Sequence, residues 1–327
     1  MKRVLLAALL LAAVLCGCSG VSGQPADDDP ILLEFEAQTW QLACAGGKNS
    51  IDAQTADYFA QLVYRETNGA VTVEYSTGAA PADDSTDLSL FSSLLWADRD
   101  PRFGVLSLPF LFDSEADAAA VLDGAGGEAL AAILLEYGQH CIGIGSGGFR
   151  CLTNNLRPIA APADLSGLRI RVEDSPLLRE AYSLWGAECV TADWPLVYTA
   201  LRTGTYDGQE MPPEAADASS IQDVQSHATR WTGLYSGMFF CMDKTLYDSL
   251  SPTLREIVDT CGQKTVAYQR QLLADATASI LSRWSRAGVT VTELTAENAA
   301  AFRAAAQPCY DRFAQGASAD LAAIFAG

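Results

Sequence analysis

Helix-forming sequence runs almost without interruption from Pro252 to about Ala287. At about 1.5 Å per residue, one helix of this length would be about 50 Å long. That length exceeds the width of one small domain, so we expect a helix that packs across two lobes. Two shorter helices that break near Gly262 are the alternative.

The first 17 residues have the pattern of a bacterial lipoprotein signal peptide. Two bases near the start precede an apolar run that ends at Leu15 and is too short for a membrane span. A short lipobox-like stretch then leads to Cys18, which predicts cleavage after residue 17 and a diacylglycerol on the Cys18 sulfur. An ordinary signal peptide that is cut nearby is the alternative. Residues 18–30 are mostly polar and are expected to form a flexible tether.

The chain is acidic, with 21 bases against 40 acids and a net charge of −19. Loss of residues 1–17 removes two bases and no acids, which leaves 19 bases and a net charge of −21. This charge argues against nucleic acids and anionic lipid surfaces as partners. It would also repel an anionic ligand, so local arginines would have to supply the attraction. A merely solvated acidic surface is the simpler interpretation.

Length and composition predict a folded chain of about two domains. The chain has 327 residues, of which 49% are hydrophobic, and it can bury a large core. Hydrophobic periodicity predicts a strand at 31–35, a helix at 51–66 and a strand at 71–75. It further predicts a buried strand and turn at 103–112, a helix at 127–137, strands at 141–147 and 289–294, and helices within 296–326.

No set of residues predicts catalysis or a cofactor. The two histidines, His140 and His227, are isolated, and neither an HExxH nor a G-x-S-x-G motif is present. Gly143, Gly145 and Gly148 match G-x-G-x-x-G, but they lead into FRCLTN instead of an apolar helix, so dinucleotide binding is not expected. Seven cysteines beyond the lipobox are scattered singly and predict no zinc site, although one disulfide would be compatible with them. We therefore expect a chain that is not an enzyme and holds no cofactor or metal.

A strand-to-helix junction near residue 171 has the chemistry for anion binding. In LRIRV, alternation places Arg169 and Arg171 on one face of a strand. Ser175 is predicted as an N-cap and Pro176 as the first helical residue, so Arg171 lies near the carboxyl end of that strand, where ligands gather in open α/β sheets. A guanidinium group is permanently charged and can bind a carboxylate through two parallel hydrogen bonds. An exposed strand arginine without a ligand is the alternative.

Five motifs, in order along the chain, resemble those of a family of transport proteins. The family is the dicarboxylate-binding-protein-like group of extracytoplasmic solute-binding proteins of tripartite ATP-independent periplasmic (TRAP) transporters, which mostly capture small organic acids. The resemblance extends from about residue 31 to the end. The motifs are FGVLSLPFLF at 103–112, GFRCLTN at 148–154, DLSGLRIRV at 164–172, PLVYTALRTGTYDGQE at 195–210 and DKTLYDSL at 243–250.

The resemblance implies a two-lobed, periplasmic-binding-protein-like α/β fold with a cleft, crossover segments and a long helix that spans both lobes. Lobe I would comprise residues 31–147 and about 237–276, and lobe II residues 148–236 and about 277–327. The function implied is that of a lipid-anchored monomer without a cofactor, which captures a small organic acid outside the cell and delivers it to a TRAP permease. A ligand-sensing protein that presents its ligand to a receptor and a divergent lipoprotein without a transport role are the alternatives.

The resemblance also implies ligand-binding residues. Arg171 matches an arginine that clamps a carboxylate, and Arg150 matches a second arginine at the cleft, although alone it would be a solvated loop charge. Trp194 matches an aromatic residue that packs on the carbon skeleton of the ligand, with core packing as the alternative. Met211 stands where relatives have an asparagine that reaches the ligand. Gln38, Ser92 and Asp174 align with further ligand-contacting positions, and Tyr235 lies near the expected second crossover.

Two departures from the family pattern affect the expected ligand. Relatives carry an extra helix where residues 78–87 form only a short polar link, so part of a cleft wall would be missing. Met211 replaces an amide by a thioether, which predicts a less polar pocket at that point. We therefore expect a ligand that is more apolar, or larger, than a C4-dicarboxylate.

Overall fold

A computed structural model of the chain describes residues 35–79, 86–315 and 318–326. The expected signal peptide, Cys18 and the tether lie outside the described residues, as does most of the short link at 78–87. The chain from Phe35 onward forms one compact unit. No single helix in the described ranges is long and apolar enough to cross a membrane, and one bent pair, 115–122 with 125–136, passes that test by length and composition alone.

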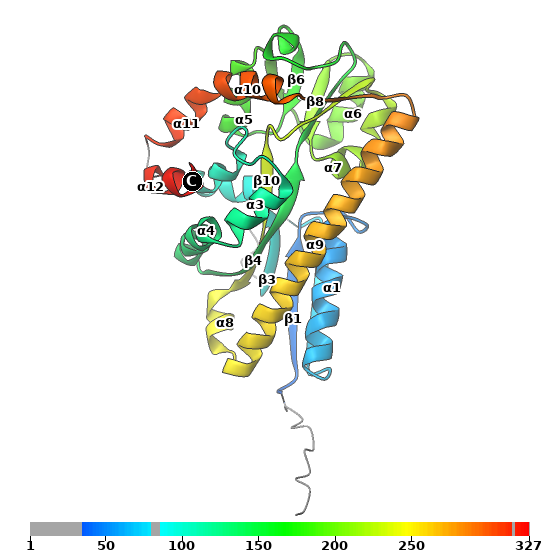
Figure 1. Cartoon of the computed structure of the whole chain (residues 1–327). Coiled ribbons are helices and arrows are strands. Elements are labelled where there is room, and N and C mark those ends of the chain that lie inside the picture. Colours follow the sequence, from blue (N-terminus) through cyan, green and yellow to red (C-terminus); the bar gives the residue numbers. More distant parts are fainter. Residues whose placement is uncertain (1–34, 80–85, 316–317, 327) are drawn as a thin grey trace, which may run out of the picture. The chain divides into compact units, whose positions relative to one another are not determined.

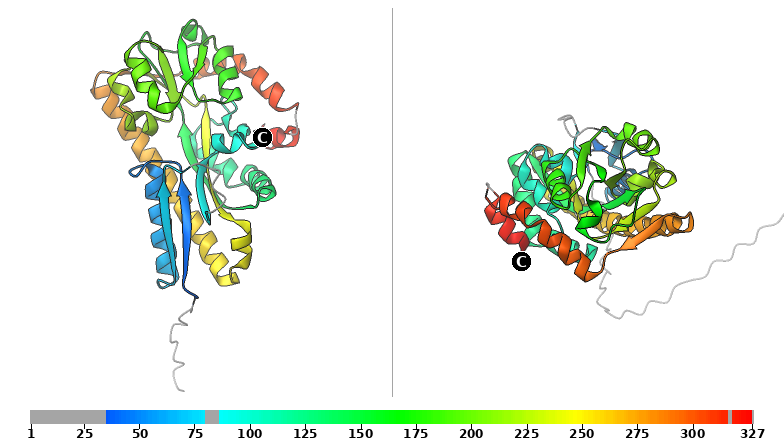
Figure 2. Two further views of the ribbon diagram at one scale, coloured as in Figure 1. Left: turned by 180° about the vertical axis from the view of Figure 1, so that it is seen from behind. Right: turned by 90° about the horizontal axis from the view of Figure 1, so that it is seen from above.

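Two mixed β-sheets organise this unit (Figure 1, Figure 2). In the first sheet, the strand at 38–44 pairs in parallel with the strands at 71–77 and 88–92. The strand at 235–243 pairs in antiparallel orientation with the strands at 88–92 and 139–149. Among the described residues, the strand order of the first sheet is β2 (Val71–Thr77), β1 (Gln38–Cys44), β3 (Leu88–Ser92), β10 (Tyr235–Asp243) and β4 (Gln139–Phe149). That of the second sheet is β11 (Thr290–Glu293), β9 (His227–Arg230), β5 (Cys151–Asn154), β8 (Gly208–Met211), β6 (Arg169–Val172) and β7 (Glu188–Thr191).

Helices connect the strands and cover the sheets (Figure 1). The α-helices before the crossing to the second sheet are α1 (Ile51–Glu66), α2 (Ser93–Ala97), α3 (Glu115–Leu122) and α4 (Ala125–Glu136). Those that follow are α5 (Pro176–Leu184), α6 (Trp194–Arg202), α7 (Pro213–Ala218), α8 (Lys244–Ser249), α9 (Pro252–Arg286), α10 (Ala296–Ala305), α11 (Gln307–Phe313) and α12 (Ala319–Ala326). Short 3-10 helices are η1 (Pro101–Ser107), η2 (Pro162–Leu165) and η3 (Ile221–Asp223).

Most of the predicted elements within the described ranges are confirmed, and one is wrong. The first strand that the structure describes is β1, at 38–44; residues 31–34 of the strand expected at 31–35 lie outside the described residues, and Phe35 lies outside any strand. The apolar run at 103–112 begins in the helix η1 instead of a strand. The Asp100 side chain accepts a hydrogen bond from the Arg102 backbone nitrogen at 2.9 Å and starts that helix. A run that is buried on every side has no period that separates strand from helix, so the sequence pattern could not distinguish them.

The long helix α9 is unbroken over 35 residues, so the alternative with a break near Gly262 is wrong. Gly262 serves packing, because a Cβ at this position would lie 3.0 Å from the Ile142 carbonyl oxygen of β4. Facing it on β4, Gly143 and Gly145 would place a Cβ at 2.7 and 2.6 Å from side-chain atoms of α9. The first two glycines of the G-x-G-x-x-G match therefore allow a helix and a sheet to approach closely.

The chain passes from one sheet to the other at three places within the described ranges. A single residue, Arg150, joins β4 to β5, residues 231–234 join β9 to β10, and α9 leads toward β11. The Arg150 backbone nitrogen donates to the Leu234 carbonyl oxygen at 2.9 Å, and the Trp231 indole nitrogen donates to the Arg150 carbonyl oxygen at 2.9 Å. The first two crossings are therefore hydrogen-bonded to each other.

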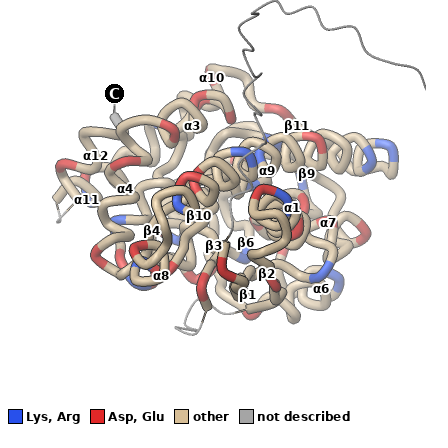
Figure 3. The backbone as a smooth tube through the Cα atoms, turned by 90° about the horizontal axis from the view of Figure 1, so that it is seen from below, with Lys and Arg blue, Asp and Glu red and all other residues tan. Residues whose placement is uncertain are grey.

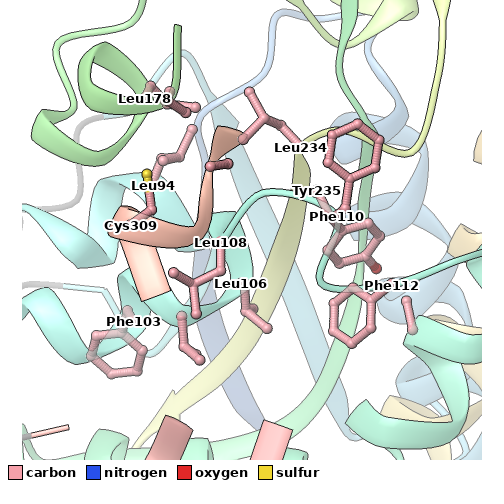
Figure 4. Close-up of a cluster of buried hydrophobic side chains, with 14 of the residues drawn as sticks. Leu94, Phe103, Leu106, Leu108, Phe110, Phe112, Leu178, Leu234, Tyr235 and Cys309 are labelled. Carbon is pink, nitrogen blue, oxygen red and sulfur yellow. The ribbon is translucent and has the colours of Figure 1, made fainter. Parts of the chain in front are cut away.

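The largest hydrophobic cluster extends through both sheets. At its centre Phe110 packs edge-to-face against Trp185 and Trp231, and Phe302 of α10 packs against both tryptophans. Figure 4 shows the neighbouring part of this cluster, where Phe110 and Phe112 lie close to the start of β10. The last helix, α12, packs against α4 and η1 and so lies with the first sheet. The chain end thus returns to the half in which the described fold begins.

Two carboxyl groups in the first turns of helices, those of Asp52 in α1 and Glu214 in α7, have raised pKa values. Burial raises the pKa of Glu214 from 4.5 to about 7 and that of Asp52 from 3.8 to about 6. The charges of Asp52 and Glu115 also raise the pKa of Glu214, whereas Arg150 lowers it. At a pH between its unfolded and folded pKa values, Glu214 takes up a proton when the protein folds. The free energy of unfolding should therefore fall as the pH rises from about 4.5 to about 7.

We expect Glu214→Gln to flatten this pH dependence by on the order of 1 kcal/mol, because glutamine cannot titrate. Urea unfolding of the wild type and the variant at about pH 5.5 and about pH 7.5 measures the difference. Asp223→Gln is a control at an exposed acid of the neighbouring η3 helix. Parallel pH profiles for wild type and Glu214→Gln would show that Glu214 titrates normally.

Candidate ligand-binding site

A cavity of about 370 Å³ lies at the carboxyl ends of β6 and β7, which pair in parallel. The segments after these two strands form one wall, and α2, which follows β3 of the first sheet, supplies another. The volume falls within the range of small-molecule sites. The described residues that line the cavity are Leu94, Asp98, Arg171, Glu173, Asp174, Ser175, Thr191, Ala192, Asp193 and Trp194.

Arg171 supplies the positive charge of this cavity. Its side chain is held in place because Nε and Nη2 donate to the Ala192 carbonyl oxygen at 3.2 and 3.1 Å, and its guanidinium lies 5.3 Å from the centre of the Trp194 ring. The residue is only 6% exposed, and its buried Nη1 has no hydrogen-bond partner among the described residues. Burial also lowers the pKa of the Arg171 guanidinium from its ordinary value. A buried donor without an acceptor is costly, so this nitrogen is suited to an anionic ligand atom.

Arg150, in contrast, is already neutralised by protein carboxylates. Its Nε and Nη2 donate to the two carboxylate oxygens of Glu210, and Nη2 also donates to Glu173 Oε2 at 2.8 Å. Arg150 is 3% exposed and Glu210 is fully buried, so this is an interior ion pair. The Met211 sulfur lies 3.2 Å from the same Nη2. Arg150 and Met211 do not line the 370 Å³ cavity, but Glu173 connects Arg150 to it.

The other expected site residues divide into two groups. Trp194, the first residue of α6, and Asp174, which pairs with Arg179, line the cavity together with Arg171. Three residues do not line it. Ser92 caps α2, Gln38 begins β1 at the far end from α2 and accepts a hydrogen bond from Trp40 Nε1, and the buried Tyr235 packs between Phe112 and Phe149.

Several cavity residues were not predicted from the sequence. Glu173 had a usable signal, since it follows directly on the predicted strand that contains Arg171, whereas the strand that ends shortly before Asp193 was not predicted. Asp98 had none, because only the tertiary fold brings the end of α2 to this wall. Glu210 lies in the family-like DGQE turn, but nothing in the sequence shows that it is the partner of Arg150.

Acidic side chains outnumber the basic one around the cavity. The described lining holds four carboxylates, from Asp98, Glu173, Asp174 and Asp193, and one guanidinium, from Arg171. Burial, and then the charges of Glu173 and Asp174, raise the pKa of Asp98 above its ordinary value. Acidic residues are also spread over helices of both halves (Figure 3).

A larger cavity, of about 540 Å³, lies along α9. Two arginines line it, and both are ion-paired, Arg150 with Glu210 and Arg230 with Glu293. Neither offers an unused charge to a ligand. The cavity that contains Arg171 is therefore the better candidate for a ligand-binding site.

The cavity is lined by segments that follow strands of both sheets and contains a buried arginine with a donor that has no partner among the described residues, an arrangement suited to binding a small anionic solute. The family model of DctP, a bacterial extracellular solute-binding protein of family 7, matches residues 43–316. The chain belongs to this family.

Three known proteins illustrate the relationship. The chain is 33% identical over 205 residues to the 2,3-diketo-L-gulonate-binding periplasmic protein YiaO of Escherichia coli K12, and that match covers 63% of this chain and 62% of the relative, less than two thirds of its length. It is 27% identical over 335 residues to the C4-dicarboxylate-binding periplasmic protein DctP of Rhodobacter capsulatus, covering 99% and 97% of the two chains. A TRAP periplasmic solute-binding protein from Ochrobactrum anthropi has a similar structure, with a TM-score of 0.83 and 29% identity over 89% of this chain and 95% of the other.

These matches confirm the resemblance to TRAP solute-binding proteins and the expected two-lobed α/β fold. The family consists of extracytoplasmic solute-binding proteins, and the chain is not an enzyme.

Proposed function

We propose that this protein captures a small organic acid and that Arg171 binds its carboxylate. The observation that carries the proposal is the buried Nη1 of Arg171, which has no partner among the described residues although the residue lines a cavity of ligand size. A carboxylate matches the fork of a guanidinium, and it would supply the missing acceptor. The names of two relatives, for 2,3-diketo-L-gulonate and for C4-dicarboxylates, support an acid as the ligand class.

We also propose roles for the neighbouring residues. Trp194 and Asp174 line the cavity and would contact the ligand directly. Arg150 would act indirectly, because its hydrogen bond fixes the position of Glu173 in the cavity wall. Met211 would pack against Arg150. The site therefore has one cation that is free to bind a ligand.

A thermal-shift screen of small carboxylates tests the proposed function. A ligand that binds only the folded state at about 100 times its Kd should raise the free energy of unfolding by about 2.7 kcal/mol. Primary amides of the same acids serve as controls, because they retain the shape and lose the charge. If acids and amides both leave the melting temperature unchanged across a broad panel, the protein does not capture organic acids.

The two halves of the fold are proposed as the two lobes that enclose the ligand. Lobe I would contain residues 31–147 and about 237–276, and lobe II residues 148–236 and about 277–315. The packing of α12 on α4 supports a return of the last residues to lobe I, which changes the end of the expected lobe II. Native-state hydrogen exchange would test the assignment, since two cooperative units with these boundaries are expected.

We propose that the protein is a lipid-anchored monomer that delivers its ligand to the membrane subunits of a TRAP permease. The lipobox-like sequence before Cys18 supports the anchor. Cys18→Ser should move the protein from the detergent phase to the aqueous phase, or leave an uncleaved precursor, and should lower uptake of a verified ligand by intact cells. Mature wild-type protein found wholly in the aqueous phase would rule out the anchor, and unchanged uptake without the protein would rule out delivery.

A further inference from the structure

Two cysteines lie directly opposite each other on neighbouring strands of the first sheet. Cys141 is in β4 and Cys241 is in β10, and the antiparallel register pairs one with the other. Residues that face each other in an antiparallel pair have Cα atoms about 4.5–5.5 Å apart. A disulfide joins cysteines whose Cα atoms are about 4.4–6.8 Å apart. The register therefore places these two cysteines at a separation that a disulfide can bridge.

An irregularity in the strand pairing produces this arrangement. The register shifts between Phe240 and Cys241, and Phe240 faces Gly143. A regular ladder would then place Ile142 opposite Cys241. Because β4 has one extra residue at this point, Cys141 faces Cys241 instead. The bulge thus brings a second sulfur, and not an aliphatic side chain, opposite Cys241.

The two cysteine side chains lie on the same face of the sheet. Cys241 belongs to the largest hydrophobic cluster and Cys141 packs against it, whereas the neighbouring Ile142 and Phe240 belong to a different cluster. Cys241 is fully buried, Cys141 is half-buried, and both are thiols in the structure. Burial, and then a hydrogen bond with Cys141 and its charge, raise the pKa of the Cys241 thiol well above its ordinary value. The two sulfurs are therefore in contact.

The other cysteines of the described strands face residues of other types. Their partners in the ladders are Thr77 and Leu90 for Cys44, Met211 for Cys151 and Ile170 for Cys189. Within the described ranges, strand pairing thus joins two cysteines at one place. The family is extracytoplasmic, and disulfides form and persist in extracytoplasmic compartments.

We propose that Cys141 and Cys241 form a disulfide once the protein has left the cytoplasm, with an external disulfide as the oxidant. The thiolate of the half-buried Cys141 attacks one sulfur of the external disulfide, whose S–S bond breaks and releases a first thiol. The Cys241 sulfur then attacks the Cys141 sulfur and releases the second thiol. Two electrons and two protons pass from the cysteine pair to the two thiols that leave.

The bridge would close the excursion of the chain into the second sheet. β4 leads into the Arg150 crossing, and β10 follows the crossing at 231–234. The strands β5 to β9 of the second sheet lie between the two cysteines in the sequence. Closing so long a loop removes conformations from the unfolded chain and stabilises the fold. Neither cysteine lines the Arg171 cavity, so this inference is independent of the proposed function.

Non-reducing peptide mapping of the exported full-length protein tests the proposal. Free thiols are first blocked with N-ethylmaleimide in denaturant, before the protein is digested. We expect the peptides that contain Cys141 and Cys241 to be linked and to separate on reduction with dithiothreitol. The other described cysteines should carry the maleimide. Protein that is reduced before blocking is the control, and both peptides should then carry the maleimide.

Reduction of two variants measures the effect of the bridge on stability. Dithiothreitol should lower the melting temperature of the wild type by about 4 °C or more, and it should not change that of Cys141→Ser. Cys189→Ser is the matched control, because Cys189 is also a half-buried strand cysteine but faces Ile170. The melting temperature of this control should still fall on reduction, as in the wild type.

Maleimide on both cysteines of the exported protein would overturn the proposal, whether or not the variants fold. A link from Cys141 or Cys241 to any other cysteine would overturn it as well. So would a melting temperature that falls equally for wild type and Cys141→Ser on reduction, because the stabilising bridge would then lie elsewhere.

Discussion

Arg171→Ala is expected to weaken binding of a verified acid ligand by a factor of about 30 or more. Loss of the partner of a desolvated carboxylate costs roughly 2–5 kcal/mol, because the charge of the ligand remains in the cavity without compensation. Arg171→Lys should restore only part of the affinity, since a lysine ammonium lacks the planar pair of donors. Calorimetry on the wild type and both variants measures the three affinities.

Arg169→Ala is the matched control for Arg171, because both arginines lie on the same face of β6. Arg169 pairs with Asp207 and donates to the Gly204 carbonyl oxygen, and it does not line the cavity. Its loss should lower stability slightly and leave the affinity unchanged. Equal affinities for wild type and Arg171→Ala would remove the carboxylate-clamp assignment and the main reason to regard the ligand as an acid.

Glu210→Ala is expected to destabilise the folded protein by about 3–5 kcal/mol, because it leaves Arg150 in the interior without its principal partner. Arg150 is 3% exposed, and the remaining carboxylate, Glu173, is itself 33% exposed. Because Arg150 itself is almost fully buried, water cannot replace the lost carboxylate of Glu210 at low cost. Urea unfolding gives the change in free energy directly.

Two further variants make this prediction specific. Glu293→Ala breaks the exposed pair with Arg230, in which both side chains are more than half exposed, and should cost less than about 1 kcal/mol. The double variant Arg150→Met with Glu210→Leu removes both charges and should recover much of the stability. A loss for Glu210→Ala as small as that for Glu293→Ala would show that Arg150 is not an interior cation.

The position of Arg171 could be predicted because local signals agree around it. Alternation fixed the strand, and the structure confirms Ser175 as N-cap, with its side chain accepting from the Leu178 nitrogen, and Pro176 as the first residue of α5. The long helix α9 was predictable for a similar reason, since nothing in its sequence terminates it before Arg286. Such features depend on neighbours in the chain, and these are visible in a sequence.

Other parts of the site depend on contacts between distant residues and could not be predicted. The pairing of Arg150 with Glu210 joins positions 60 residues apart, so the sequence showed a candidate cation and not its neutralisation. The wall formed by Asp98 likewise depends on how α2 meets the second sheet. The three glycines of the G-x-G-x-x-G match show the same limit of prediction. Their spacing was noticed, but the reason for the first two, the approach of α9 to β4, lies more than 100 residues further along the chain.

The one-residue crossing at Arg150 lies between the two sheets and reaches a residue that lines the candidate cavity. Its backbone is tied to the second crossing through Leu234 and Trp231, and its side chain holds Glu173 at the cavity. The same residue is thus part of the connection between the two sheets and part of the charge network beside the cavity. We expect any displacement of Glu173 on ligand binding to act on this crossing through a single arginine side chain.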